Sequence, residues 1–270
     1  MKYEYLSETV AVKTVSENER EGVFEIEGLY TGYGTTIGNS LRRALLSSLP
    51  GAAITQVKIK GVGHEFTTIP GVKEDMVEIM LNLKRVRFRI HTAEPQTLTL
   101  KYGGEGEVRA SDIATNAQVE VITLEAHIAT VTEKDAEFEA ELTVEKGLGY
   151  VPAEARKSEK LPIGVIALDA IFSPVLKVNF SVESMRVGER TDYDRLRLNI
   201  GTDGSITPSQ ALRKASKILE DHFSKISGIE ILEAKPIEPA PDKAVKKEKK
   251  KTGRKKKEEK KEEKKEEKKE

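Results

Sequence analysis

Residues 38–51 read GNSLRRALLSSLPG, and this short segment places two adjacent arginines in the middle of an apolar stretch. Plotted at about 100° per residue, as in an α-helix, most of its apolar side chains fall on one face. That face comprises Ile37, Leu41, Ala44, Leu45, Ser48 and Leu49. We expect Thr35 or Thr36 to cap the start of this helix, and Pro50 with Gly51 to end it.

The opposite face of this predicted helix carries Asn39, Arg42 and Arg43, with Leu46 between the two arginines. A polar face with one stray leucine is common on the solvent side of a helix. Arginines around an apolar side chain are also typical of protein–protein interfaces. The pattern of this segment alone leaves both interpretations open.

The charge of the chain is unevenly distributed. Basic and acidic residues number 45 each, but residues 241–270 hold 16 basic and 9 acidic ones, so residues 1–240 carry a net charge of −7. The negative net charge of residues 1–240 argues against a broad nucleic-acid-binding surface on this part of the chain. The absence of cysteine excludes disulfides and thiolate chemistry. Without a signal-like start or an 18-residue apolar stretch, we expect a cytoplasmic protein with no contact to membranes.

Alternating polar and apolar residues predict a chain rich in strands. Such segments lie at 8–15, 22–28, 54–60, 85–90, 96–102, 119–132 and 136–147. A helix is predicted at 73–84, where acidic residues occupy the first turn. Two further segments, at 175–187 and 194–200, are expected to form a hairpin with a turn at 187–194.

A long amphipathic helix is predicted after residue 206, with Thr207 as N-cap, Pro208 at the first helical position and Gly228 at the end. Its apolar stripe consists of Leu212, Ala215, Ile218, Leu219, His222, Phe223 and Ile226. From Lys235 the chain is first rich in proline and then almost entirely lysine and glutamate. We expect a disordered linker and tail there, which either keeps the protein soluble or attracts nucleic acid weakly.

No pattern in the sequence predicts an active site. The four histidines form no closely spaced pair, and neither a G-x-S-x-G elbow nor a Walker loop occurs. The glycine-rich stretch at 32–38, GYGTTIG, is only a weak match to a nucleotide-binding loop. Asp192 and Asp194 of the stretch TDYD could bind a metal ion, but aspartates between strands more often form turns. The sequence therefore predicts protein–protein interfaces but no active site, which indicates a scaffold protein.

Five segments together resemble the α subunit of bacterial RNA polymerase. They read GNSLRRALLSSLPGAAITQVKIKGVGHEF, GVKEDMVEIMLNLK, GYVPA, PIGVIALDAIFSPV and ERTDYDRLRLNI, in the family's order over about residues 5–230. The resemblance implies an α+β fold in two parts: a dimerisation subdomain made of residues 1–50 and 175–230, and a mostly β subdomain inserted at 51–174. Residues 231–270 would be the linker and tail.

The resemblance also implies partners and contact residues. The chain would form a homodimer and serve as the assembly platform for the β and β′ subunits, with omega and sigma joining in the holoenzyme. The implied contacts are Arg43, Leu46 and Arg42 for β; Lys84, Leu168 and Val175 for β′; and Leu41, Leu45, Leu212, Leu219 and Phe223 for the dimer. The chain itself would hold no catalytic residue, metal or cofactor, because another subunit binds the catalytic Mg²⁺.

One departure from the family is large. Its members usually continue into a C-terminal domain that binds upstream promoter DNA, whereas only low-complexity sequence follows Lys235. We therefore expect contact with DNA only through the complex or, without specificity, through the tail. Two rival interpretations stay open at this point: a free-standing nucleic-acid-binding protein that acts through its lysines, and an enzyme whose active site is not visible in the sequence.

Overall fold

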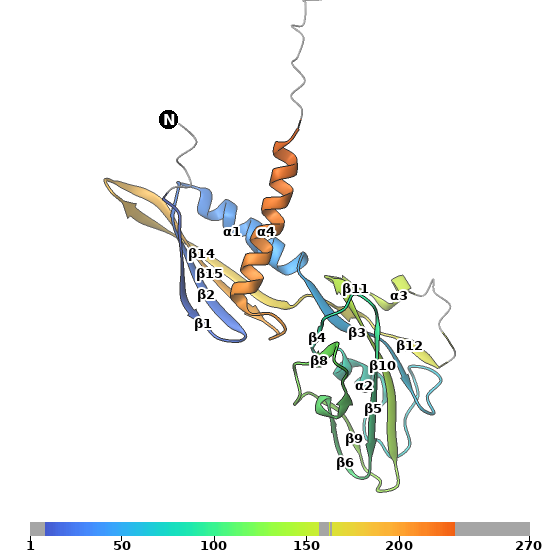
Figure 1. The fold of residues 1–270 in the computed structure, drawn as a ribbon. Coiled ribbons are helices and arrows are strands. Elements are labelled where there is room, and N and C mark those ends of the chain that lie inside the picture. The colour runs from blue at the N-terminus through green and yellow to red at the C-terminus, as the bar shows by residue number, and fades with distance from the viewer. Residues whose placement is uncertain (1–8, 157–161, 163, 230–270) are drawn as a thin grey trace, which may run out of the picture. The chain divides into compact units, whose positions relative to one another are not determined.

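The computed structural model describes residues 9–156, 162 and 164–229, so the predicted linker and tail at 231–270 lie outside the described residues. The described residues form a four-stranded sheet, a seven-stranded sheet and two two-stranded pairs, together with four α-helices and one short 3-10 helix (Figure 1). This mixture confirms the predicted α+β fold class.

The four-stranded sheet joins segments from the two ends of the described chain. In spatial order it consists of β1 (Ala11–Glu17), β2 (Glu21–Leu29), β15 (Arg190–Thr202) and β14 (Val175–Val187), all antiparallel (Figure 1). Helix α1 (Tyr33–Ser47) contacts β14 and β15, and α4 (Pro208–Ser227) adds Ala211 and Ala215 to the same hydrophobic core. Alternate residues of β2, among them Phe24 and Ile26, are buried there because a strand turns every second side chain to one face.

The seven-stranded sheet has its own, larger core. Its order is β7 (Ile113–Ala114), β5 (Gln96–Gly103), β10 (Glu137–Leu148), β3 (Pro50–Ile59), β4 (Phe88–Ile90) and β8 (Val119–Val121), while β12 (Val165–Ala167) also pairs with β3. The two-stranded pairs are β6 (Gly106–Arg109) with β9 (His127–Val131) and β11 (Tyr150–Val151) with β13 (Ala170–Ile171). The remaining elements are α2 (Met76–Leu83), η2 (Ala110–Asp112) and α3 (Ala153–Arg156). A small third cluster holds Ala53, Ala170 and Phe172. The two large cores agree with a two-part chain, and the subdomain boundaries stay a prediction.

Two predictions about strands were wrong. The continuous strand predicted at 119–132 is interrupted at residues 122–126, because β8 pairs with β4 whereas β9 pairs with β6. The turn predicted at 187–194 contains only Gly188 and Glu189, since Val187 already pairs with Arg190. Gly188 has φ of 62°, a left-handed conformation that suits glycine in so tight a hairpin turn.

Candidate interaction surfaces

Helix α1 has the two faces that its sequence predicts. Leu41, Ala44 and Leu45 are buried in the core beneath the helix, whereas Arg42 and Arg43 are exposed. Leu46 lies on the same outer side, with 36% of its surface exposed. Within the described part of the chain, neither guanidinium has a hydrogen bond or an ion pair, so both are available to a partner.

The sheet positions helix α1 closely. A Cβ atom at Gly38 would lie 2.8 Å from the ring of Phe180, and one at Gly34 would lie 2.7 Å from Val182 Cγ1. Only glycine permits this approach of the helix backbone to β14. As a result, the outer face of α1 has a fixed direction relative to the strands.

The predicted N-cap of α1 was wrong. The helix begins at Tyr33, its N-cap position is Gly32, and no side chain from its own start caps it. Instead, the backbone N–H groups of Gly32 and Gly34 donate to Asp194 Oδ2 at 2.9 and 3.0 Å. A carboxylate there satisfies free amides and complements the positive end of the helix dipole. Sequence reasoning missed this role, because Asp194 lies 160 residues along the chain.

The turn expected at the stretch TDYD was wrong, because residues 191–194 belong to strand β15. Asp192 accepts hydrogen bonds from Arg190 Nη2 at 2.7 Å and from Thr31 Oγ1 at 3.0 Å. The Arg190 bond, followed by the Thr31 bond, lowers the pKa of Asp192 to about 2. Arg190 also lies 5.2 and 5.4 Å from the ring centroids of Tyr30 and Tyr193, so the hairpin is tied to the start of α1.

Helix α4 leaves its far end uncovered. Its predicted start is confirmed: Thr207 Oγ1 accepts from the Gln210 N–H at 3.4 Å, and the helix begins at Pro208. Leu212 and Leu219 are partly buried against the core, but Phe223 and Ile226 are 60% and 66% exposed. His222, expected in the apolar stripe, is exposed, and its Nδ1 lies 2.7 Å from the Ile218 carbonyl oxygen of its own helix.

The residues implied in β′ contact differ in accessibility. Lys84 follows α2 at the surface and donates to Asp169 Oδ2 at 2.9 Å. The pKa of Asp169 is lowered, first by the Ala153 N–H and then by Lys84. Leu168 and Val175 are buried, each in a different core. Of the three, Lys84 is the residue that a partner can reach directly.

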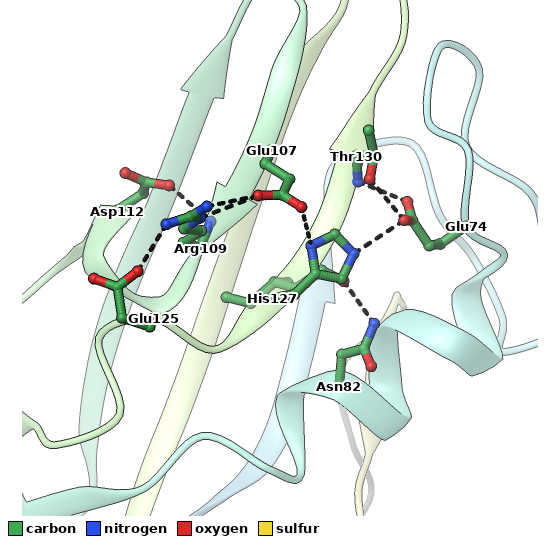
Figure 2. Close-up of polar contacts among 9 residues, drawn as sticks. Glu74, Asn82, Glu107, Arg109, Asp112, Glu125, His127 and Thr130 are labelled. Carbon is green, nitrogen blue, oxygen red and sulfur yellow. Dashed lines mark hydrogen bonds and ion pairs between the residues drawn. The ribbon is translucent and has the colours of Figure 1, made fainter.

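A polar cluster around His127 joins the buried Glu74 to strand β9 (Figure 2). Glu74 is buried and accepts from Thr130 N at 2.6 Å, Thr130 Oγ1 at 2.8 Å and His127 Nε2 at 3.0 Å. Figure 2 shows Glu107 on the other side of His127, and its Oε1 lies 3.7 Å from His127 Nδ1, too far for a hydrogen bond. This cluster fastens the segment before α2 to β9.

Across the described residues, no group of three or more His, Asp or Glu side chains is placed to hold a metal ion. Nor does any described helix combine the length and the apolar character needed to cross a lipid bilayer.

Comparison with known proteins identifies the family. Residues 57–173 match the family model of the RNA polymerase Rpb3/RpoA insert domain. The DNA-directed RNA polymerase subunit alpha of Alkaliphilus oremlandii is 52% identical over 215 residues, which are 80% of this chain and 68% of that protein. Subunits of the same name from Symbiobacterium thermophilum and Carboxydothermus hydrogenoformans are 53% and 49% identical, over 77% and 82% of this chain and 66% and 72% of their own lengths. The chain therefore belongs to the family of alpha subunits of DNA-directed RNA polymerase, a nucleotidyltransferase complex.

Proposed function

We propose that two copies of this chain form a homodimer, and that the dimer is the platform on which the β and β′ subunits of the polymerase assemble. The observation that carries the proposal is the two-faced helix α1. One face belongs to the chain's own core, while Arg42, Arg43 and Leu46 point outward without a partner among the described residues. Catalysis and its Mg²⁺ are assigned to another subunit, so this chain acts by positioning.

The exposed end of α4 supports dimerisation. A helix of 20 residues is about 30 Å long, and here it packs on the core only as far as Leu219. An isolated helical end with Phe223 and Ile226 in water lacks the tertiary packing that normally stabilises helices. A second copy would cover both side chains. Leu41 and Leu45 are enclosed by their own chain, so the proposed dimer surface depends on Leu212, Leu219 and Phe223 instead.

The outer face of α1 suits the proposed contact with β. A guanidinium group binds a carboxylate through two parallel hydrogen bonds, and a leucine between two such groups provides an apolar anchor. The close packing of Gly34 and Gly38 and the capping by Asp194 fix the helix before binding. A preorganised surface of this kind loses little conformational entropy on association.

Replacing Arg43 by alanine tests the β contact. We expect Arg43→Ala to leave the dimer intact and to weaken β binding at least tenfold, about 1.4 kcal/mol, as for other interface arginines. The measurement is titration of purified β into the full-length dimer, with dimer mass followed by light scattering. Lys134→Ala, in an exposed turn away from α1, is the matched control. Equal β affinity of Arg43→Ala and the unmodified chain would count against the proposed docking face.

A further inference from the structure

A small cavity lies between the seven-stranded sheet and the start of α4. It has a volume of about 270 Å³ and is lined by the beginning of β3, by β4, by the end of β10 and by the first turns of α4. Lys146 of β10 is opposite Ala52 of β3, and Ala52 is opposite Phe88 of β4, so three neighbouring strands form one wall. Gln210 and Lys214, one turn apart on α4, also line the cavity. Segments distant in the sequence therefore meet here only in the folded chain.

Arg89 holds the wall of this cavity in place. Its Nε donates to the Ser205 carbonyl at 2.9 Å, and its Nη2 donates to the Gly204 carbonyl at 3.1 Å. Its Nη1 pairs with Glu120 Oε2 at 2.9 Å. These bonds join β4 to the segment just before α4, so the cavity is formed before any ligand arrives. A preorganised site loses little conformational entropy on binding.

The cavity carries positive charge that the chain does not neutralise. Lys146 and Lys214 are exposed, and among the described residues neither ammonium group has an ion pair or a hydrogen bond. His91 also lines the cavity, and no described residue that lines it is Asp or Glu. Glu120 is already paired with Arg89 and is not one of the lining residues. An anion in the cavity would meet two lysines and no competing carboxylate.

The backbone amides at the start of α4 already have acceptors. The Ser209 N–H donates to Glu17 Oε1 at 2.8 Å, and the Gln210 N–H donates to Thr207 Oγ1 at 3.4 Å. An anion in the cavity would therefore be bound by side chains and not by the helix end.

The donors of the cavity suit a phosphate group. Lysine binds phosphate as a point charge with three donors, whereas the planar fork of arginine is the usual partner of a carboxylate. Lys146 and Lys214 approach from two different elements, and the Gln210 side chain adds a neutral donor. The volume lies just below the range of about 300–1,000 Å³ that is typical of small-molecule sites. A small ligand therefore fits this cavity better than a protein segment does.

We propose that this cavity binds the phosphate group of a small molecule, either inorganic phosphate itself or a mononucleotide. Lys146 and Lys214 would neutralise the phosphate, and Gln210 would donate to one of its oxygens. The base of a nucleotide would lie against Ile90 and His91, which line the same cavity. This site is additional to the assembly role and shares no residue with the contacts proposed for β, β′ or the dimer.

Calorimetric titration of the full-length dimer with inorganic phosphate and with AMP tests the proposal. We expect one ligand per chain, with weaker binding as the salt concentration rises. Lys146→Gln and Lys214→Gln should each weaken binding at least tenfold, because each removes a charge-assisted hydrogen bond. Gln210→Glu preserves the size of the side chain but places a carboxylate among the lysines, so it should weaken binding to a similar extent. Lys134→Gln, in the exposed turn before β10, should change nothing.

The two probes separate the possible sources of the phosphate. At least tenfold tighter binding of AMP identifies a nucleotide site, whereas equal or weaker binding of AMP identifies a site for the inorganic anion. Binding of neither probe at millimolar concentration overturns the proposal. Equal binding by the unmodified chain, Lys146→Gln and Lys214→Gln also overturns it, since the lysine-rich tail at 241–270 would then account for the attraction. Gln210→Glu replaces one good helix former by another, so it remains a test if a lysine variant misfolds.

Discussion

Several of the side chains that organise this molecule act across long distances in the sequence. Asp194 satisfies the amides at the start of α1 from strand β15, and Glu74 joins the segment before α2 to Thr130 and His127. Both carboxylates accept hydrogen bonds from backbone N–H groups, which fix local geometry more firmly than exposed ion pairs do. Substitution of either residue should therefore have a measurable local effect.

Removal of the Asp194 carboxylate should loosen the first turn of α1. We expect Asp194→Ala to lower the free energy of unfolding by about 1 kcal/mol, the usual value of a lost helix cap. Hydrogen exchange at the amides of Gly32 and Gly34 should accelerate, because they lose their acceptor. Asp194→Asn retains one oxygen and should lie between the two. Identical exchange at these two amides in Asp194→Ala and the unmodified chain would refute the capping role.

The Glu74 cluster predicts a pH-dependent stability. Burial raises the pKa of Glu74, but hydrogen bonds from Thr130 and His127 outweigh it, so the pKa lies below the ordinary value of 4.5. A carboxylate with a lowered pKa stabilises the folded state fully above its unfolded value, and that contribution disappears as the pH falls through the folded value.

Glu74→Gln tests this contribution directly. At pH 7 the variant should be less stable by about 1.5–3 kcal/mol, the range for hydrogen bonds to a charged group. The difference from the unmodified chain should shrink as the pH falls below 4.5, where the carboxylate of the unmodified chain becomes protonated. Urea unfolding across this range is the measurement, with the exposed Glu105→Gln as control. A difference independent of pH would show that the charge of Glu74 is unimportant.

At the scale of elements, α4 makes the clearest prediction. Phe223→Asp should leave the fold unchanged, because the side chain makes no core contact, and should weaken the dimer roughly 30-fold or more, as for an interface anchor. Analytical ultracentrifugation over a dilution series measures this. Lys214→Asp places the same charge about 180° around α4 from Phe223 and should leave the dimer intact. Equal dimer affinities for both variants would exclude the end of α4 from the interface.

Some features of the helices and strands could be predicted from the sequence, and others could not. The buried and exposed faces of α1, the start of α4 at Pro208 and the long β14–β15 hairpin follow from local periodicity, and the structure confirms them. The cap of α1 and the break at 122–126 could not be predicted, because each depends on which distant strand is the neighbour.

At the scale of the whole molecule, one chain builds two large hydrophobic cores. The first core combines residues from both ends of the described chain, and the second belongs to the strands between them. Arg89 connects the two regions: its guanidinium donates to the carbonyls of Ser205 and Gly204, just before α4. A chain arranged in this way has the outer face of α1 and the end of α4 as separate exposed surfaces.

The central claim is that two copies of this chain assemble the polymerase, and stoichiometry tests it most directly. The measurement is a tagged pull-down of the full chain from its native host, followed by native mass spectrometry of the intact complex. We predict a complex that contains two copies of this chain together with one copy each of two much larger subunits, β and β′. A complex with a single copy of this chain, or recovery of the chain without either large subunit, would contradict the account.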